Sequence, residues 1–461
     1  MKFVIIGNGV AGMEAALVLR DRDERADITV ISEESDHFFS RTALMYVVCG
    51  QLAHSDIEPL ERDVYERLRL HRVRGRAIGL DVEGKTVTMA GSLPAVPYDK
   101  LLICAGSSPR RAPFWKGYDA LKGVGHLVTM QDLAWLHTEL HGRDPYDQPE
   151  RADAHLAHTV PSSPYLPRDT AFAARGHTSR RPAVVGGGLI GIESIEVMLA
   201  AGLKPTFLIR DKWFWPIALD EREATWIGQE MSHHGVDVRT QHNVESLSGD
   251  DKGCLSAIHT DQGQLDADLL VVAIGVVPQT SWLEGSPIER QERGGGIVVD
   301  EAFRTNVDSV YAAGDCAAVR WHNGVVRPEQ LWYTGRDQGR RAAASLLGDT
   351  VAYERGSLYN SAKLMDIEYT TAGLVGWNLD GERDVFIEEK GKVRSTTRFV
   401  LQGDTVVGFN ALGRRWDHSI INRWIEQRRS LAWVLDHLQQ ASFDTEFVPP
   451  LAIPASVRPT P

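Results

Sequence analysis

The chain has 461 residues and carries 62 acidic against 50 basic side chains, a formal net charge of −12. This length predicts two or three domains, and the acidic balance disfavours general nucleic-acid binding because a phosphate backbone repels negative charge. No apolar run is long enough to cross a bilayer, and no basic–apolar signal segment precedes the first strand pattern, so we expect no membrane span.

The cysteines are few and widely spaced along the chain. The four positions are Cys49, Cys104, Cys254 and Cys316, with no CxxC pair. This spacing disfavours a disulfide framework, a zinc site and an iron–sulfur centre, so no metal site is predicted. A reducing cytoplasm is the compartment that fits such unpaired thiols.

The first motif is a glycine fingerprint at residues 3–20, FVIIGNGVAGMEAALVLR. An apolar strand pattern precedes Gly7, Gly9 and Gly12, and a helical pattern follows. These glycines allow a tight turn, a close backbone approach to a pyrophosphate and tight helix–strand packing, in that order. The next strand pattern, DITVISEE, supplies Glu33, which is placed to hydrogen-bond a ribose diol. The motif therefore predicts a dinucleotide site.

A second fingerprint lies at residues 181–202, RPAVVGGGLIGIESIEVMLAAG, with glycines at Gly186, Gly188 and Gly191. The following strand ends in Arg210 instead of an acid. An arginine there can hold the 2′-phosphate of NADP, or it can be a solvated strand end, so NADH and NADPH both stay open. Two such units predict two bound dinucleotides and a hydride passing between them.

Four later segments complete an ordered pattern: DKLLICAGSSPR (99–110), DLLVVAIGVVPQT (268–280), TNVDSVYAAGDCA (305–317) and YTGRDQGRRAAASLLG (333–348). Together with the glycine fingerprints they resemble the pyridine nucleotide–disulfide oxidoreductase superfamily. Within it, the resemblance is greatest to rubredoxin reductases and to the flavin module of assimilatory nitrite reductases. The resemblance implies bound FAD and NADH or NADPH, with further cofactor contacts from Ala105, Gly106, Gly275, Gly314, Asp315 and Trp332.

The expected fold class is α/β, with two Rossmann-like three-layer dinucleotide-binding domains and a small α+β C-terminal domain. The FAD domain is expected to be discontinuous, and the NAD(P)H domain to carry a proline-rich insertion. The expected ranges are 1–115 with 275–350 for FAD, 116–274 for NAD(P)H, 143–181 for the insertion, 351–440 for the C-terminal domain and 441–461 for an extended tail.

Residues 37–51, HFFSRTALMYVVCGQ, decide whether sulfur takes part in the chemistry. In thiol-using members of the superfamily a redox cysteine stands two residues before a triplet that corresponds here to Leu44-Met45-Tyr46. This position is Thr42, which cannot form a thiolate or a disulfide. Cys49 lies further along in an apolar context and is expected to pack as a small hydrophobe.

The same stretch resembles the Arg-x-x-Leu segment of the electron-transferring reductases, which implies that Arg41 approaches the FAD phosphates. A lysine often found shortly afterwards beside the flavin is replaced by Tyr46 or Val47. Without that lysine, Glu193 is left either to orient the nicotinamide or to favour its helix N-terminus.

The C-terminal part contains two predicted features. Two alternating runs around Gly403-Asp404 predict a hairpin. Residues 413–438 predict an amphipathic helix whose arginines form a basic cluster, either a solvated side of a dimer or core helix, or a docking face for an acidic carrier. The cluster contains Arg414, Arg415, Arg423, Arg428 and Arg429. His155 and His158, in the insertion, are expected to be solvated loop side chains.

The leading functional hypothesis is a cytoplasmic FAD-dependent NAD(P)H oxidoreductase that passes electrons to a rubredoxin- or ferredoxin-like carrier or to a partner subunit, without a cysteine relay. The alternatives are an NAD(P)H oxidase or small-acceptor reductase, and a flavin-bearing redox sensor. A homodimer is a further possibility that the sequence leaves open.

Overall fold

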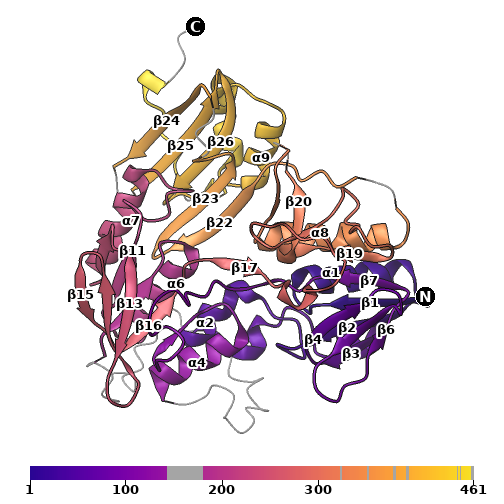
Figure 1. Cartoon of the computed structure of the whole chain (residues 1–461). Helices are drawn as coiled ribbons and strands as arrows, with labels where there is room; N and C mark the ends of the chain where they lie inside the picture. The colour runs from indigo at the N-terminus through magenta and orange to yellow at the C-terminus, as the bar shows by residue number, and fades with distance from the viewer. Residues whose placement is uncertain are drawn as a thin grey trace.

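The computed structural model describes most of the chain, and its elements are arranged around two parallel sheets with a third, antiparallel sheet beside them (Figure 1). The described residues are 1–142, 180–321, 324–349, 352–376, 380–390, 394–443, 445–446 and 448–457. Apart from Arg180 and Arg181, the predicted insertion, with His155 and His158, lies outside them. Within these ranges, no helix is long and apolar enough to cross a membrane.

The first parallel sheet is built from the N-terminal fingerprint. Its order is β19-β7-β1-β2-β3, with helices α1 and α8 packed together. The strands read as apolar runs because a parallel sheet is buried on both faces. The bounds are β1 (Lys2–Ile6), α1 (Val10–Arg22), β2 (Asp27–Ser32), β3 (Leu70–Arg74), β7 (Lys100–Ile103), β19 (Val310–Ala312) and α8 (Trp332–Leu346).

The second parallel sheet is formed around the second fingerprint in the order β12-β11-β10-β16-β9. The prediction of two Rossmann-like units with a small C-terminal domain is therefore confirmed. The bounds are β9 (Val124–Gly125), α4 (Met130–His141), β10 (Pro182–Val185), α6 (Leu189–Ala200), β11 (Thr206–Ile209), α7 (Glu221–His233), β12 (Asp237–Thr240) and β16 (Leu269–Val272).

Smaller elements complete these two units. The antiparallel pair β8 and β17 links them, and two short helices lie between β2 and β3. The bounds are α2 (Leu44–Val48), α3 (Val64–Arg67), β4 (Ala77–Asp81), β5 (Thr86–Met89), β6 (Val96–Pro97), β8 (Ser107–Pro109), β13 (Val244–Gly249), β14 (Leu255–Thr260), β15 (Gly263–Asp266), β17 (Val276–Pro278), β18 (Ile297–Val298), β20 (Ala317–Arg320) and β21 (Val326–Pro328).

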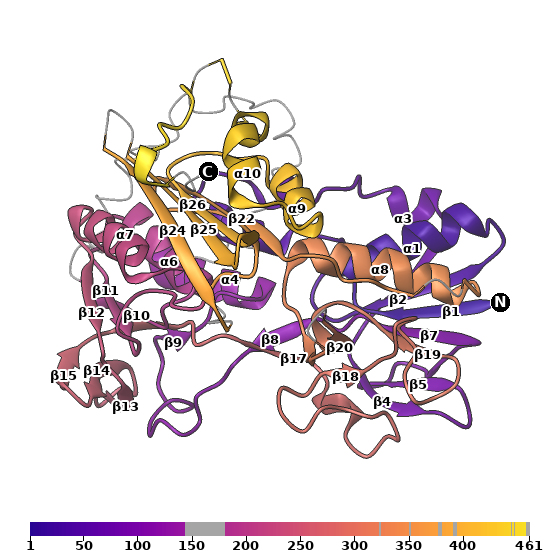
Figure 2. The same ribbon diagram turned by 90° about the horizontal axis from the view of Figure 1, so that it is seen from above.

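The C-terminal part is an antiparallel sheet, β22-β23-β26-β25-β24, with helices on one face (Figure 2). The predicted hairpin is confirmed, since Gln402 pairs with Thr405 across the turn Gly403-Asp404. The bounds are β22 (Tyr359–Leu364), β23 (Ile367–Gly373), β24 (Glu382–Glu389), β25 (Ser395–Gln402), β26 (Thr405–Leu412), α9 (His418–Glu426) and α10 (Leu431–His437).

The prediction of one amphipathic helix over 413–438 is wrong, because this stretch forms the two helices α9 and α10. Arg428 adopts a left-handed conformation (φ 55°), which stops α9, and Ser430 then caps α10 by accepting from the Trp433 N–H. The apolar periodicity was still informative, because side chains of both helices enter one core: Ile421, Trp424, Leu431, Val434 and Leu435.

The predicted basic cluster is also not one surface. Arg414 is buried and donates to Glu389 at 2.8 Å and to the Pro449 carbonyl at 2.8 Å. The segment after α10 also packs against the C-terminal domain. Leu451 is buried in the core of this domain, and the Ala452 N–H donates to Glu389. Arg414 therefore stabilises the C-terminal domain and is not available to a partner.

A buried polar network joins α7 of the second unit to the C-terminal sheet. Arg398 on β25 donates to Glu223 at 3.0 Å and to the Ala218 carbonyl at 2.9 Å, and Asn410 on β26 donates to Glu223 at 3.0 Å. The Arg398 and Glu223 side chains are 4% and 0% exposed. Buried charges in such pairs are tolerated only while both partners are present.

We expect Glu223→Ala to lower the free energy of unfolding by about 3 kcal/mol, because it removes the close partner of the buried Arg398 guanidinium and leaves only Asp384, at 3.6 Å, to pair with it. Urea unfolding followed by tryptophan fluorescence measures this change. The matched control is Glu221→Ala, a solvent-exposed carboxylate two residues away that pairs with Lys212, and it should leave the midpoint unchanged. Equal midpoints for the two variants would contradict a bridging role for Glu223.

Candidate functional site

A cavity of about 1180 Å³ lies where the two dinucleotide folds meet. It is lined by residues of the first glycine loop, the stretch around α2, the first half of α6, the start of α8 and strand β22 of the C-terminal sheet. Elements of both dinucleotide-binding units and of the C-terminal domain thus line the same cavity.

The first glycine loop has the geometry that the fingerprint predicts. A Cβ on Gly7, whose φ is 115°, would lie 2.0 Å from the Cys104 carbonyl oxygen, and one on Gly12 would lie 2.0 Å from the Gly7 carbonyl oxygen. No atom lies within 4 Å of a Cβ built on Gly9. Gly7 and Gly12 are therefore required for packing, whereas Gly9 leaves space beside the backbone where a ligand can approach.

The second loop repeats this geometry. A Cβ on Gly186 would lie 2.2 Å from the Ala273 carbonyl oxygen, and one on Gly191 would lie 2.1 Å from the Gly186 carbonyl oxygen, while Gly188 again has open space. In each loop a helix N-terminus follows at once, α1 after Gly9 and α6 after Gly188. Unpaired N–H groups at such ends attract phosphate.

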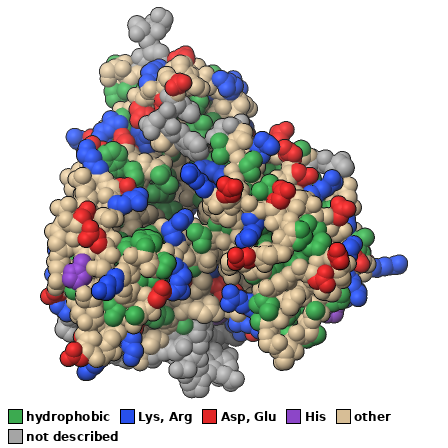
Figure 3. All heavy atoms as spheres, viewed as in Figure 1, with side chains coloured by type: hydrophobic (Ala, Val, Ile, Leu, Met, Phe, Trp, Pro, Cys, Tyr) green, Lys and Arg blue, Asp and Glu red, His purple; other side chains and the backbone are tan. Residues whose placement is uncertain are grey.

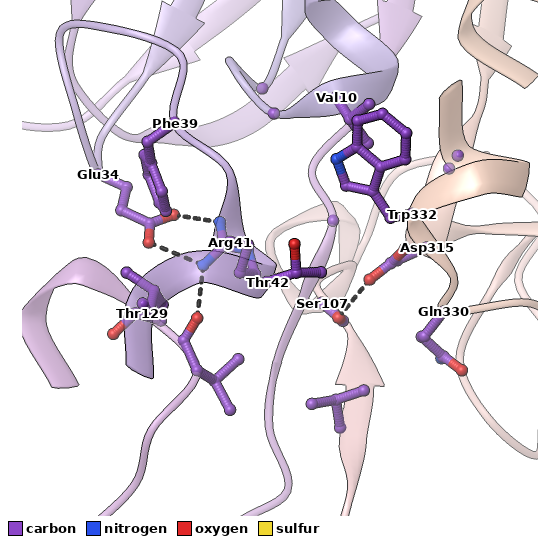
Figure 4. A pocket seen from close by; sticks show the side chains of 18 of the residues that line it. Val10, Glu34, Phe39, Arg41, Thr42, Ser107, Thr129, Asp315, Gln330 and Trp332 are labelled. Carbon is purple, nitrogen blue, oxygen red and sulfur yellow. Dashed lines mark hydrogen bonds and ion pairs between the residues drawn. The ribbon is translucent and has the colours of Figure 1, made fainter. Parts of the chain in front are cut away.

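Arg41 is held at one wall of the cavity (Figure 4). Its guanidinium donates to both Glu34 oxygens, at 2.8 and 2.7 Å, and to the Val128 carbonyl at 2.6 Å, yet its side chain stays 40% exposed. Burial opposes the charge on Glu34, but Arg41 and the Met130 N–H hold the pKa of that carboxyl below its usual value. Arg41 is thus fixed in position with part of its surface facing the hollow.

Glu33 lies beside Glu34 and also lines the cavity. It accepts a hydrogen bond from Gln279 at 3.0 Å and lies 3.6 Å from Arg76. Gln279 and Arg76 line the cavity as well. Gln279 lies in the segment 268–280, where it was given no role of its own, and Arg76 belongs to none of the motifs.

Asp315 and Trp332 lie at the opposite wall (Figure 4). The Ser107 hydroxyl donates to Asp315 at 2.7 Å, and burial raises the pKa of this carboxyl. The indole Nε1–H of Trp332 is buried and has no acceptor among the described protein atoms. This N–H is covered by protein atoms, so Trp332 contributes its ring and not its N–H to the cavity wall.

The remaining predicted residues divide between the cavity and its surroundings. Ala105, Gly106 and Gly314 line the cavity. Gly275 lies at the link between the units, where its carbonyl accepts from the Arg110 N–H. Arg210 follows β11 with a 77% exposed side chain and lies 3.7 Å from Asp211, outside the cavity.

The positions of Thr42 and Cys49 show whether a cysteine can take part in redox chemistry at the cavity. Thr42 is exposed and lines the cavity, whereas Cys49 ends α2 outside the cavity lining. Burial and the charge of Glu196 raise the pKa of Cys49 to about 12. All four cysteines are free in the described structure, with Cys104 and Cys316 buried. The residue at the reactive position therefore has no sulfur. Burial raises the pKa of Cys104, the cysteine that lines the cavity among the described residues, as it does that of Cys49, so neither thiol is reactive.

Helix α6 contributes two acidic side chains to the cavity wall, one more than the sequence predicted. Glu193 lines the cavity together with Glu196 from the next turn of α6, Tyr46 from α2 and Lys363 from β22. The sequence singled out Glu193 as a residue left without the family's lysine, either to orient the nicotinamide or to favour its helix N-terminus. Glu196 and Lys363 were missed, because Lys363 reaches this place only through the packing of the C-terminal sheet.

The fold and the cavity together define a protein with two dinucleotide-binding units that share one hollow. Residues 1–339 match the family described as pyridine nucleotide-disulphide oxidoreductase. The chain belongs to this family, which confirms the expected superfamily.

Curated relatives and solved structures agree with this assignment. The chain is 27% identical over 418 residues to nitrite reductase [NAD(P)H] of Bacillus subtilis (strain 168), covering 88% of this chain and 45% of that protein, so it spans less than half the length of this relative. It is 25% identical over 432 residues to the ferredoxin–NAD(+) reductase component of the p-cumate 2,3-dioxygenase system of Pseudomonas putida, covering 93% and 94%. The fold matches the covalent putidaredoxin reductase–putidaredoxin complex with a TM-score of 0.76 at 20% identity, covering 93% of each chain.

We expect Cys49 to resist alkylation by iodoacetamide at pH 8 in the folded protein. With a pKa of about 12, the thiolate fraction at that pH is on the order of 10⁻⁴. Peptide mapping by mass spectrometry measures the labelling, and the same protein unfolded in urea is the control in which Cys49 reacts. Rapid labelling of Cys49 in the native protein would show a reactive thiol and contradict this account.

Proposed function

We propose that this chain is an FAD-dependent NAD(P)H oxidoreductase that passes electrons to a carrier protein of the ferredoxin or rubredoxin kind, or to a partner subunit, without a cysteine relay. The observation that carries the proposal is the cavity shared by two dinucleotide folds, with Thr42 at the position of the redox cysteine. When bound, FAD accepts a hydride from the nicotinamide and releases the electrons to an acceptor.

The residues at the first site fit an FAD molecule. Gly9 leaves space for a pyrophosphate at the α1 N-terminus, and Arg41 presents a positive charge to it. Glu33 is available to a ribose diol, and Asp315 to hydroxyl groups of the flavin side chain. Trp332 adds an aromatic ring to the wall. Donors and acceptors of both kinds thus face the hollow.

The residues at the second site fit a pyridine nucleotide. Gly188 leaves open space before the α6 N-terminus, and Leu189 and Ile190 line the cavity, so a nicotinamide held there reaches the same hollow as the flavin. The exposed Arg210 side chain can hydrogen-bond a 2′-phosphate, which supports NADPH. The described residues around Arg210 are equally compatible with NADH. Both nucleotides are therefore kept in the proposal.

A continuous row of aromatic rings supports an electron carrier as the acceptor. Trp332, in the cavity wall, lies 5.5 Å from Tyr333, Tyr333 lies 5.0 Å from Tyr359, and Tyr359 stacks on His418 at 4.8 Å, all measured between ring centroids. The row leads from the cavity across the start of α8 to the start of α9. It indicates where a partner can approach the flavin closely.

Local charge supports a partner with an acidic face. Arg336 lies over the Trp332 ring at 5.2 Å beside this row, and Arg423 is exposed on α9. Acidic and basic side chains are intermixed over the face shown in Figure 3, so the net charge of −12 does not form one repulsive field there. Complementary charge of this kind raises the rate and specificity of docking.

The cytoplasm is the proposed compartment, supported by the free cysteines of the described residues. A homodimer stays a prediction that a single chain does not test.

The function is tested by anaerobic stopped-flow mixing of the FAD-loaded protein with NADH and with NADPH, followed by an oxidised ferredoxin or rubredoxin. We expect rapid bleaching of the flavin by at least one nucleotide, and reoxidation by the carrier that is faster than reoxidation by dissolved oxygen. Fast reoxidation by oxygen alone would favour an oxidase. Slow reduction that leaves a stable complex would favour a redox sensor.

The FAD site is tested by Asp315→Ala, with Asp308→Ala, an exposed acid seven residues earlier, as the control. Loss of a buried acceptor for a ligand hydroxyl leaves that hydroxyl unpaired and weakens binding by roughly tenfold or more. The dissociation constant for FAD, measured by quenching of flavin fluorescence, should rise for Asp315→Ala and stay unchanged for Asp308→Ala. Unchanged FAD binding by both variants would remove Asp315 from the site.

A further inference from the structure

Two carboxyl groups lie on one face of α6 where this helix lines the cavity. Glu193 and Glu196 are three residues apart, so their side chains are neighbours on the helix, and both line the hollow. The Met365 N–H donates to Glu196 at 2.8 Å and holds it in place. No hydrogen bond or ion pair to Glu193 is found among the described residues, so its carboxyl faces only the cavity and its neighbours.

The groups around this pair come from two other elements. Tyr46 on α2 and Cys49 at its end face the pair, as do Lys363 on β22 and Asp366 in the turn between β22 and β23. Lys363 lies 3.3 Å from Asp366, so part of its charge is already neutralised. Tyr46 and Cys49 are neutral and Lys363 is paired with Asp366, so these groups supply no net positive charge to offset two carboxylates.

This environment favours the protonated carboxyls near neutral pH. Burial, aided by the charge of Glu196, raises the pKa of Glu193 to about 8. Burial also raises the pKa of Glu196 to about 7, while the Met365 N–H and Lys363 work in the opposite direction. A positive charge arriving in the cavity would reverse the balance, because an opposite charge nearby favours the ionised carboxylate.

We propose that Glu193 and Glu196 form a proton-holding pair that distinguishes the oxidised pyridine nucleotide from the reduced one by its charge. The oxidised nicotinamide ring is a cation and the reduced ring is neutral. Binding of the oxidised form converts one carboxyl of the pair to a carboxylate and releases one proton to solvent, whereas binding of the reduced form releases none. The inference rests on the proposed function, because it requires a nicotinamide in this cavity.

The sign of the pH dependence follows from linkage. Below the pKa of the free pair, binding of the oxidised nucleotide must expel a proton, so its affinity rises as the pH rises. The rise levels off above the pKa of Glu193, about 8, because the pair is then already ionised. The affinity for the reduced nucleotide stays flat over the same range. Release of the oxidised product is thus easier at lower pH.

Isothermal titration of the FAD-loaded protein with NAD⁺, NADH, NADP⁺ and NADPH between pH 6 and pH 9 tests the proposal. Proton release is counted from the heats in two buffers of different ionisation enthalpy. For the wild type we expect roughly tenfold tighter binding of the oxidised nucleotide at pH 8 than at pH 6.5, with proton release, and no such change for the reduced nucleotide.

Three variants complete the experiment. Glu193→Gln is isosteric with the protonated carboxyl and should remove most of the pH dependence, while Glu245→Gln, an exposed acid on β13, should keep it. Lys363→Met should move the rise to higher pH, because Lys363 lowers the pKa of Glu196. Equal pH dependence for oxidised and reduced nucleotides, or an unchanged profile in Glu193→Gln, would overturn the inference and leave the proposed function standing. Absence of nucleotide binding at every pH would instead overturn the proposed function.

Discussion

At two glycines, Gly7 and Gly186, one backbone segment packs directly against another, and these two close contacts determine the arrangement of the whole site. At Gly7 and at Gly186 any Cβ would lie within 2.0–2.2 Å of a carbonyl oxygen on the neighbouring strand. No side chain fits there, so the first turn of each loop stays tight and directs a helix N-terminus towards the carboxyl edge of its sheet. Because this geometry occurs twice in one chain, the two edges can face a common cavity.

Much of this could be predicted from local patterns. The glycine loops, Glu33, Asp315 and the start of α8 belong to motifs whose geometry is set within a few residues, so their spacing was sufficient. The substitution of Thr42 for a cysteine could likewise be recognised from the residues alone. In contrast, the break between α9 and α10 depends on the left-handed conformation of Arg428, a residue type that does not signal such a backbone.

Features that depend on packing between distant segments could not be predicted. Lys363 reaches the cavity because β22 lies across it, and Arg414 is buried because its partner Glu389 is on β24. The pairing of Arg41 with Glu34 was also missed, although the two are only seven residues apart, since an arginine can reach many acceptors. Such contacts follow from the tertiary fold and leave no periodic pattern in the chain.

In the function proposed for this chain, electrons pass between two dinucleotides in the cavity with no sulfur in the path. Anaerobic reductive titration of the FAD-loaded protein with dithionite tests this most directly, because a redox-active disulfide would accept two electrons in addition to those of the flavin. We expect complete bleaching after two electrons per bound flavin, with no change in the number of titratable thiols. Uptake of four electrons, with new thiols appearing, would contradict it.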